Sequence, residues 1–296
     1  MSSEEAPPPR LKPIGEALGL HEIIASVRQL SFMKHHCQTL LGTLSTALET
    51  TYAKAPSGRQ AKGQTYELQR NERPDPSVRE RLLEKLIWMG WCYQAVAEHG
   101  SSFLGDVCRF IQTYQMPLQG TRNDARWGKI DLVGATPEAL PVVIELKQEG
   151  ATDTPLRMLA EGLAYGCAVR KAWNEGGLRA EWVAAMRANG LNQELPTALT
   201  TVPVILLAPA AFWNRAIGVP GKRTSGKVRD DAWPLFMDLA GQCAAHGFPV
   251  QFAQFEITTG TSPPGATTVS NVTSVVLPGC HPSKQSDCHA PAPANH

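Results

Sequence analysis

The sequence predicts an α/β fold in which a mixed β-sheet is flanked by helices. Short apolar runs bounded by turn-forming residues predict strands, and longer stretches with apolar residues at three- to four-residue spacing predict helices. The composition agrees, because 296 residues with 43% hydrophobic and 19% charged side chains are typical of one sizeable soluble domain. The expected order is α-β-β-β-α-β-α-β, with helices at 78–96, 154–172 and 231–246 and strands at 110–118, 129–133, 142–147, 202–208 and 249–257.

Two of these helices begin with recognisable start signals. Ser77 followed by Glu80 matches a capping box, in which each side chain accepts a hydrogen bond from the backbone of the other residue. Thr154 is a typical N-cap, and Pro155 suits the first helical position because its missing N–H would have no partner there. Each helix carries apolar residues on more than one side, which predicts that it is packed between other elements.

The segments on either side of the core, which we place at residues 75–257, differ from it in composition. Residues 1–74 contain a helical pattern at 14–53 followed by a polar stretch, which predicts an N-terminal helical arm and a linker. Residues 258–296 are rich in Gly, Pro, Ser and Thr, which is typical of a disordered tail.

Charge and cysteine content exclude several classes of protein. A formal net charge of +1 excludes a global basic field, so any binding of nucleic acid must use a local patch. The seven cysteines have irregular spacing and indicate reduced thiols instead of a disulfide framework. The apolar run from Val202 to Trp213 is too short to span a bilayer, and the N-terminus has no apolar signal core. We therefore expect a cytoplasmic protein without a membrane partner.

Residues capable of chemistry cluster in two neighbouring predicted strands. Glu145 and Lys147 point to the same side of their strand, because side chains alternate between the two faces. If the preceding strand is the neighbour, Asp131 converges with Glu145 on one side of the sheet. Two carboxylates and an ammonium group are costly to bury. The pattern therefore indicates a functional site.

Phosphodiester hydrolysis is a chemistry that needs such a set. Mg²⁺ prefers oxygen ligands and usually takes one or two carboxylates together with water and substrate phosphate. Asp131, Glu145 and the backbone carbonyl of Leu146 can supply the protein ligands. Lys147 can orient the attacking water or stabilise charge on the phosphate.

An acid on one strand, then Glu145-Leu146-Lys147 on the next strand, then a helix resembles the PD-(D/E)XK superfamily of restriction-endonuclease-like nucleases. The resemblance covers residues 76–257 as an order of elements and residues 131–147 as a motif. It implies a restriction-endonuclease-like sheet with Asp131 and Glu145 as metal ligands and Lys147 as the catalytic lysine.

Other positions of the family pattern are matched only in part. Many members carry a further acid on the first core helix, for which Glu84 is the candidate metal ligand. Ile130 stands before the first acid where the family has proline. Several branches carry glutamine on the helix after the lysine, where this chain has Glu161. Arg157, four residues before Glu161, is expected first to form an intrahelical ion pair and second to contact a phosphate.

The resemblance implies a divalent-metal-dependent nuclease that uses Mg²⁺ or Mn²⁺, with DNA favoured over RNA by family analogy. It also implies a homodimer as an arrangement for cutting two strands. A local basic stretch without acids suits contact with the phosphate backbone, and a solvated loop is the equal alternative. The candidate residues for binding nucleic acid are Lys222, Arg223, Lys227, Arg229 and Arg157.

Less specific interpretations remain open beside this one. Asp131 can be an acid at a strand end that accepts a turn hydrogen bond, and Glu145 and Lys147 can belong to a solvated strand face. At the level of the whole chain, one alternative is a non-catalytic restriction-endonuclease-like module that binds nucleic acid or a protein. Its helical arm would then serve dimerisation or docking. A further alternative is another α/β enzyme in which the Glu-Leu-Lys sequence is simply part of a strand.

Overall fold

A computed structural model gives the fold of the chain. It describes residues 33–56, 65–68, 79–118, 127–151, 153–217, 232–261 and 264–275. Within these ranges, no helix combines the length and the apolar character needed to cross a bilayer. The five cysteines that the structure describes are free thiols.

Six strands form one mixed sheet in the order in which they occur in the sequence. They are β1 (Phe110–Pro117), β2 (Lys129–Ala135), β3 (Pro141–Leu146), β4 (Val204–Pro209), β5 (Val250–Thr261) and β6 (Pro264–Ser274). The first three strands are antiparallel neighbours, β3, β4 and β5 run parallel, and β6 returns antiparallel to β5. The predicted α/β class, mixed sheet and three-stranded meander are confirmed.

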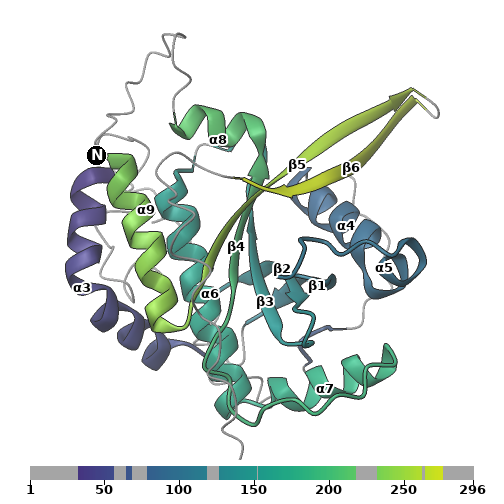
Figure 1. The fold of residues 1–296 in the computed structure, drawn as a ribbon, viewed down its shortest axis with the longest axis horizontal. Coiled ribbons are helices and arrows are strands. Elements are labelled where there is room, and N and C mark those ends of the chain that lie inside the picture. The colour runs from purple at the N-terminus through teal and green to yellow at the C-terminus, as the bar shows by residue number, and fades with distance from the viewer. Residues whose placement is uncertain are drawn as a thin grey trace, which may run out of the picture.

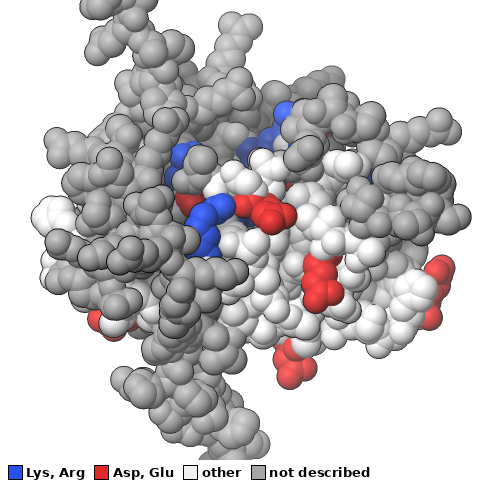
Figure 2. Space-filling model, turned by 90° about the horizontal axis from the view of Figure 1, so that it is seen from above, with Lys and Arg blue, Asp and Glu red and all other residues white. Residues whose placement is uncertain are grey.

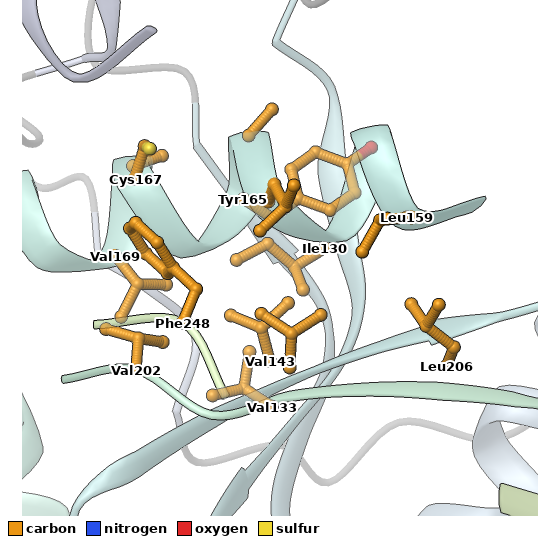
Figure 3. Close-up of a cluster of buried hydrophobic side chains, with 14 of the residues drawn as sticks. Ile130, Val133, Val143, Leu159, Tyr165, Cys167, Val169, Val202, Leu206 and Phe248 are labelled. Carbon is orange, nitrogen blue, oxygen red and sulfur yellow. The ribbon is translucent and has the colours of Figure 1, made fainter. Parts of the chain in front are cut away.

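Helices cover both faces of this sheet (Figure 1). One face carries α3 (Met33–Lys54), α6 (Pro155–Glu175) and α9 (Ala232–Cys243), and the other carries α4 (Arg79–Trp91). Helix α5 (Tyr93–His99) packs at β1, and its Val96 belongs to the same apolar cluster as α6. Because both faces are covered, every residue of β3 and β4 is buried, as expected for parallel strands at the centre of an α/β fold. Figure 3 shows the apolar cluster between α6 and the sheet, which includes Val143, Leu159 and Phe248.

The helix that follows β3 begins as the sequence predicts. Thr154 is the N-cap of α6, and its Oγ1 accepts a hydrogen bond from the Arg157 N–H at 3.2 Å. Pro155 occupies the first helical position. The helix buries residues on several sides because α3 and α7 (Leu178–Ala188) pack against it while its inner side contacts β3 and β4. The helix predicted at 231–246 is also found, as α9 followed by the 3-10 helix η3 (Ala244–His246).

The expected single helix at 78–96 is wrong, because the chain forms two helices there. Cys92 has extended backbone dihedrals and separates α4 from α5. The break lets neighbouring rings reach different partners. Trp91 contacts Phe103 edge-on, and Tyr93 contacts Phe110 edge-on, with ring centroids 5.6 and 5.3 Å apart. The capping box at Ser77 and Glu80 lies outside the residues whose side chains the structure describes.

Two further helices occur where the sequence analysis placed none. One is α7, between the helix predicted at 154–172 and the strand predicted at 202–208, and the other is α8 (Ala210–Ile217), which directly follows β4. The inner face of α7 is apolar at helical spacing, with Leu178, Trp182 and Ala185 buried. In α8, Phe212 and Trp213 are buried against the sheet, and the Trp213 indole N–H donates to the Ala253 carbonyl at 3.0 Å.

The expected flanking segments also need correction. A disordered tail from residue 258 is wrong for residues 258–261 and 264–274, which complete β5 and form β6. A plain linker is wrong for residues 65–68. The Tyr66 N–H donates to Glu181 at 2.8 Å, and Gln112 donates to the Leu68 carbonyl at 2.6 Å. The helical pattern expected at 14–53 is found over α3, but α3 is not a separate arm, because its apolar face packs against α6 and α9 in the main core.

Candidate metal and catalytic centre

Asp131 and Glu145 lie opposite each other on β2 and β3. The antiparallel register pairs Val133 with Val143, so two steps further along places Asp131 opposite Glu145. Both valines belong to the apolar cluster beneath α6. The Asp131 carboxylate accepts a hydrogen bond from the Leu146 N–H, beside Glu145, and its charge raises the pKa of Glu145, so the two acids lie close together. The convergence predicted from the sequence is therefore found.

The ladder between the two strands continues through the side chain of Asp131. Its Oδ2 accepts a hydrogen bond from the Leu146 N–H at 3.0 Å. This contact fixes the carboxylate beside the end of β3, between Glu145 and Lys147 in sequence. An acid that only caps a turn would not need to reach across to the neighbouring strand.

Lys147 is buried between two carboxylates. Its Nζ lies 2.5 Å from Glu145 Oε1 and 2.7 Å from Glu161 Oε2, and all three side chains are nearly inaccessible to solvent. Glu145 comes from β3 and Glu161 from α6, so the lysine joins the sheet to the helix above it. The alternative in which Glu145 and Lys147 belong to a solvated strand face is wrong.

A second set of charges continues outward from this cluster along α6. Arg157 Nη1 lies 2.8 Å from Asp153, and its Nε donates to Glu161 at 3.2 Å. The predicted intrahelical pair of Arg157 and Glu161 is confirmed. Asp153 also lies 3.8 Å from the Lys147 ammonium, so the two cations and the acids form one connected network.

The acids of this network differ in proton affinity because their neighbours differ. Burial raises the pKa of Glu145 well above its ordinary value, and the Asp131 charge raises it further against the opposing effect of Lys147. Burial also acts to raise the pKa of Glu161, but Lys147 and Arg157 outweigh it, and the pKa is lowered. Burial alone would lower the pKa of Lys147, yet the surrounding carboxylates raise it well above its ordinary value. Lys147 therefore stays an ammonium, and Glu145 is the acid that keeps its proton to higher pH.

A glycine of α6 permits the close approach of helix and sheet at this point. A Cβ placed on Gly162 would lie 2.7 Å from Val204 Cγ1 and 3.8 Å from the Glu145 Cβ. The absence of a side chain brings Glu161 down to the lysine. One turn later, burial and the charges of Glu145 and Glu161 raise the pKa of Tyr165 well above its ordinary value, so its hydroxyl is neutral.

The donor set at this centre fits a hard divalent cation. Glu145 Oε2 is buried and makes no hydrogen bond to any described residue, although its Oε1 accepts from Lys147. Burial, and after it the Asp131 charge, raises the pKa of Glu145, and a cation at this place would favour the charged carboxylate. In the described ranges, no three acidic, His or Cys side chains form a complete cage for an ion. Mg²⁺ usually binds only one or two protein carboxylates, which matches Asp131 and Glu145.

The raised pKa of Glu145 predicts how stability depends on pH. Since its pKa is higher in the folded chain than its ordinary value of 4.5, the folded state binds the proton more tightly than the unfolded state does. The contribution of this group is therefore complete at low pH and is lost as pH rises through the folded pKa. Glu145→Gln removes the titration. The free energy of unfolding of wild type minus that of the variant should fall as pH rises above about 4.5, measured by urea unfolding. A difference that is level or rises with pH would contradict this prediction.

The structure brings together most of the predicted site residues, with additions. Asp131, Glu145, Leu146 and Lys147 meet at one place, and Arg157 joins through Glu161. Asp153 and Tyr165 are further members that were not predicted. Tyr165 lies four residues after Glu161 on α6, and Asp153 lies four residues before Arg157, just ahead of the N-cap of the helix, so the spacing is a signal that could have found both.

One predicted residue lies apart from this centre. Glu84 is buried on α4, in the layer on the other face of the sheet, and its role as a metal ligand stays a prediction. The basic stretch with Lys222, Arg223, Lys227 and Arg229 lies outside the described residues. Comparisons of the chain with protein-family models, with curated proteins and with solved structures find no match.

Proposed function

We propose that the chain is a divalent-metal-dependent nuclease of the PD-(D/E)XK type, acting on DNA in preference to RNA. The observation that carries the proposal is the placement of two acids from neighbouring strands opposite each other, with a buried ammonium group at one of them. Such a buried set of charges is costly to maintain, and binding of a cation and a phosphate gives it a purpose.

In this proposal each residue has a distinct task. Asp131 and Glu145 hold Mg²⁺ or Mn²⁺, together with the backbone carbonyl of Leu146. The ion would polarise the phosphate and lower the pKa of a bound water. Lys147 stands beside the ion and stabilises the negative charge that develops on the phosphate. Asp131 is positioned for its task by the Leu146 N–H, and Lys147 by Glu161.

The arrangement of elements also supports the proposal. Helices α4 and α5, an antiparallel meander of three strands, helices α6 and α7 and a parallel fourth strand follow one another, which is the order that the resemblance implies with two additional helices. The acids lie where β2 and β3 meet, and the helix after the lysine covers them. We include the restriction-endonuclease-like fold in the proposal on this basis.

A cleavage assay across several nucleic acids tests the proposal. Full-length protein should degrade at least one of single-stranded DNA, double-stranded DNA and RNA in Mg²⁺ or Mn²⁺, and EDTA should stop the reaction. Asp131→Asn keeps the size of the side chain and removes its charge, and it should lose about 10²-fold or more in rate. If no substrate is cut, or if Asp131→Asn cuts as fast as wild type, the catalytic proposal fails.

A second candidate function is a non-catalytic module that binds nucleic acid or a protein. The observation that favours it is Glu161, which stands where several branches have glutamine. Glu161 and Glu145 both form salt bridges with Lys147. Calorimetric titration with Mn²⁺ separates the two candidates. Heat of binding that is present in wild type and lost in Glu145→Ala supports the metal centre. Equal titration curves for both proteins support the module without metal.

A further inference from the structure

Arg215, near the end of α8, is hydrogen-bonded to the loop that leaves the candidate centre. Its Nη1 donates to the Glu149 carbonyl at 3.0 Å, and its Nη2 donates to the Ala151 carbonyl. The guanidinium group also lies over the Phe212 ring, 5.6 Å from its centroid. Arg215 remains exposed to solvent. Figure 2 views the molecule from the end at which α8 lies and shows basic side chains beside acidic ones there.

The loop that Arg215 holds starts and ends at the centre. It leaves β3 directly after Lys147 and returns at Asp153, whose carboxylate contacts both the Lys147 ammonium and Arg157. The carbonyls that Arg215 binds are two and four residues beyond Lys147 along the chain. At a maximum of about 3.6 Å per residue, these two carbonyls lie no more than about 14 Å from the Lys147 backbone.

Lys147, Arg157 and Arg215 differ in how their charge is balanced. Lys147 is paired with Glu145 and Glu161, and Arg157 is paired with Asp153 and Glu161. Within the described residues, the contacts of Arg215 are with neutral carbonyl oxygens and an aromatic ring. Its positive charge is therefore still available to an anion, and an arginine has five N–H donors, of which these carbonyls use two.

We propose that Arg215 binds a backbone phosphate of the nucleic-acid strand next to the one at the candidate centre, an inference that rests on the proposed function. Phosphates recur at every nucleotide of a strand, so a strand whose phosphate lies at the centre carries an adjacent phosphate close to Arg215. The planar guanidinium group matches a phosphate through paired hydrogen bonds. Arg215 thus aligns the strand, while the centre acts on it.

Binding of a fluorescein-labelled DNA oligonucleotide in metal-free buffer, followed by fluorescence anisotropy, tests Arg215 apart from cleavage. Arg215→Gln should weaken binding about five- to tenfold at moderate salt. It should also reduce the slope of log affinity against log salt by about 0.7 for single-stranded DNA or about 0.9 for duplex. Arg215→Lys keeps the positive charge and loses the paired hydrogen bonds to the loop. It should retain the wild-type slope of log affinity against log salt.

A matched control comes from Arg179 on α7, at the opposite end of the molecule (Figure 1). Its Nε and Nη2 donate to the Pro196 and Leu195 carbonyls, both at 2.8 Å, so Arg179→Gln loses the same kind of contacts. It should bind DNA as wild type does.

The outcomes separate the inference from the proposed function. Equal binding by wild type and Arg215→Gln, equal losses in Arg215→Gln and Arg179→Gln, or a wild type that binds no DNA each overturn the inference. Loss of binding in Arg215→Gln alone supports it, even if wild type cleaves nothing. If wild type cleaves DNA and Arg215→Gln binds DNA as wild type does, the proposed nuclease function is supported and only the role of Arg215 is contradicted.

Discussion

Replacing Lys147 by methionine is expected to abolish metal-dependent cleavage and to lower the free energy of unfolding by about 3–5 kcal/mol. The ammonium is the shared partner of Glu145 and Glu161, both of which are buried. Without it, two carboxylates face each other away from water, and leaving one charge of a buried pair unbalanced is strongly destabilising. Guanidinium chloride unfolding measures the loss of stability, and the oligonucleotide assay measures the loss of cleavage.

A second variant keeps this prediction decisive if Lys147→Met folds poorly. Removing all three charges with Glu145→Leu, Lys147→Met and Glu161→Leu replaces the ionic cluster by apolar side chains of comparable size. Such replacements are often neutral or stabilising. The triple variant should therefore be more stable than Lys147→Met and still inactive. A single variant as stable as wild type would show that the lysine does not balance the two acids.

Placing alanine at Gly162 is expected to reduce both stability and cleavage. The new Cβ would approach Val204 Cγ1 to 2.7 Å, closer than side chains tolerate, so α6 must move away from the sheet. Overpacking of this kind costs about 1–3 kcal/mol, and the greater helix propensity of alanine offsets less than about 1 kcal/mol of it. Because Glu161 moves with α6, the Lys147 ammonium loses its position, and we expect cleavage to fall about 10- to 100-fold.

Gly241 on α9 is the matched control for this substitution. An added Cβ there meets nothing within 4 Å, and the residue is exposed. Gly241→Ala should raise the free energy of unfolding by about 0.5–1 kcal/mol through helix propensity alone and should leave cleavage unchanged. Thermal and denaturant unfolding compare the stability of the two variants, and the cleavage assay compares their activity. If Gly162→Ala is as stable and active as Gly241→Ala, the contact of α6 with the sheet does not position the centre.

The part of the centre that the sequence could predict is the part that local geometry determines. Strand alternation places Glu145 and Lys147 on one face without any knowledge of the fold, and a short connection between strands brings Asp131 beside them. The contact between Lys147 and Glu161 is different. It depends on how closely α6 approaches the sheet, which is decided by Gly162 against Val204, a residue some forty positions away in the sequence. A local pattern contains no information on that approach.

The errors in the fold have the same origin. The segment at 264–274 is rich in Thr, Ser, Gly and Pro, a composition shared by disordered tails and by edge strands, and it becomes β6 because the edge of β5 is available to pair with it. In α7, Leu178, Trp182 and Ala185 have helical spacing, but the preceding Gly177 provides no side-chain cap to mark its start. The break at Cys92 follows from where the neighbouring rings find partners, which is again a tertiary effect.

The packing of α3 against α9 has a consequence for synthesis on the ribosome. The apolar face of α3, with Leu40, Leu44 and Leu48, is covered in the finished protein partly by a helix that begins at Ala232. At translation rates of about 5–20 residues per second, roughly 10–40 s pass between the appearance of the two helices. For that time the part of the leucine stripe that α9 covers has no native partner. We expect chaperones that bind apolar segments to hold it, and a chain interrupted before α9 to aggregate when they are depleted.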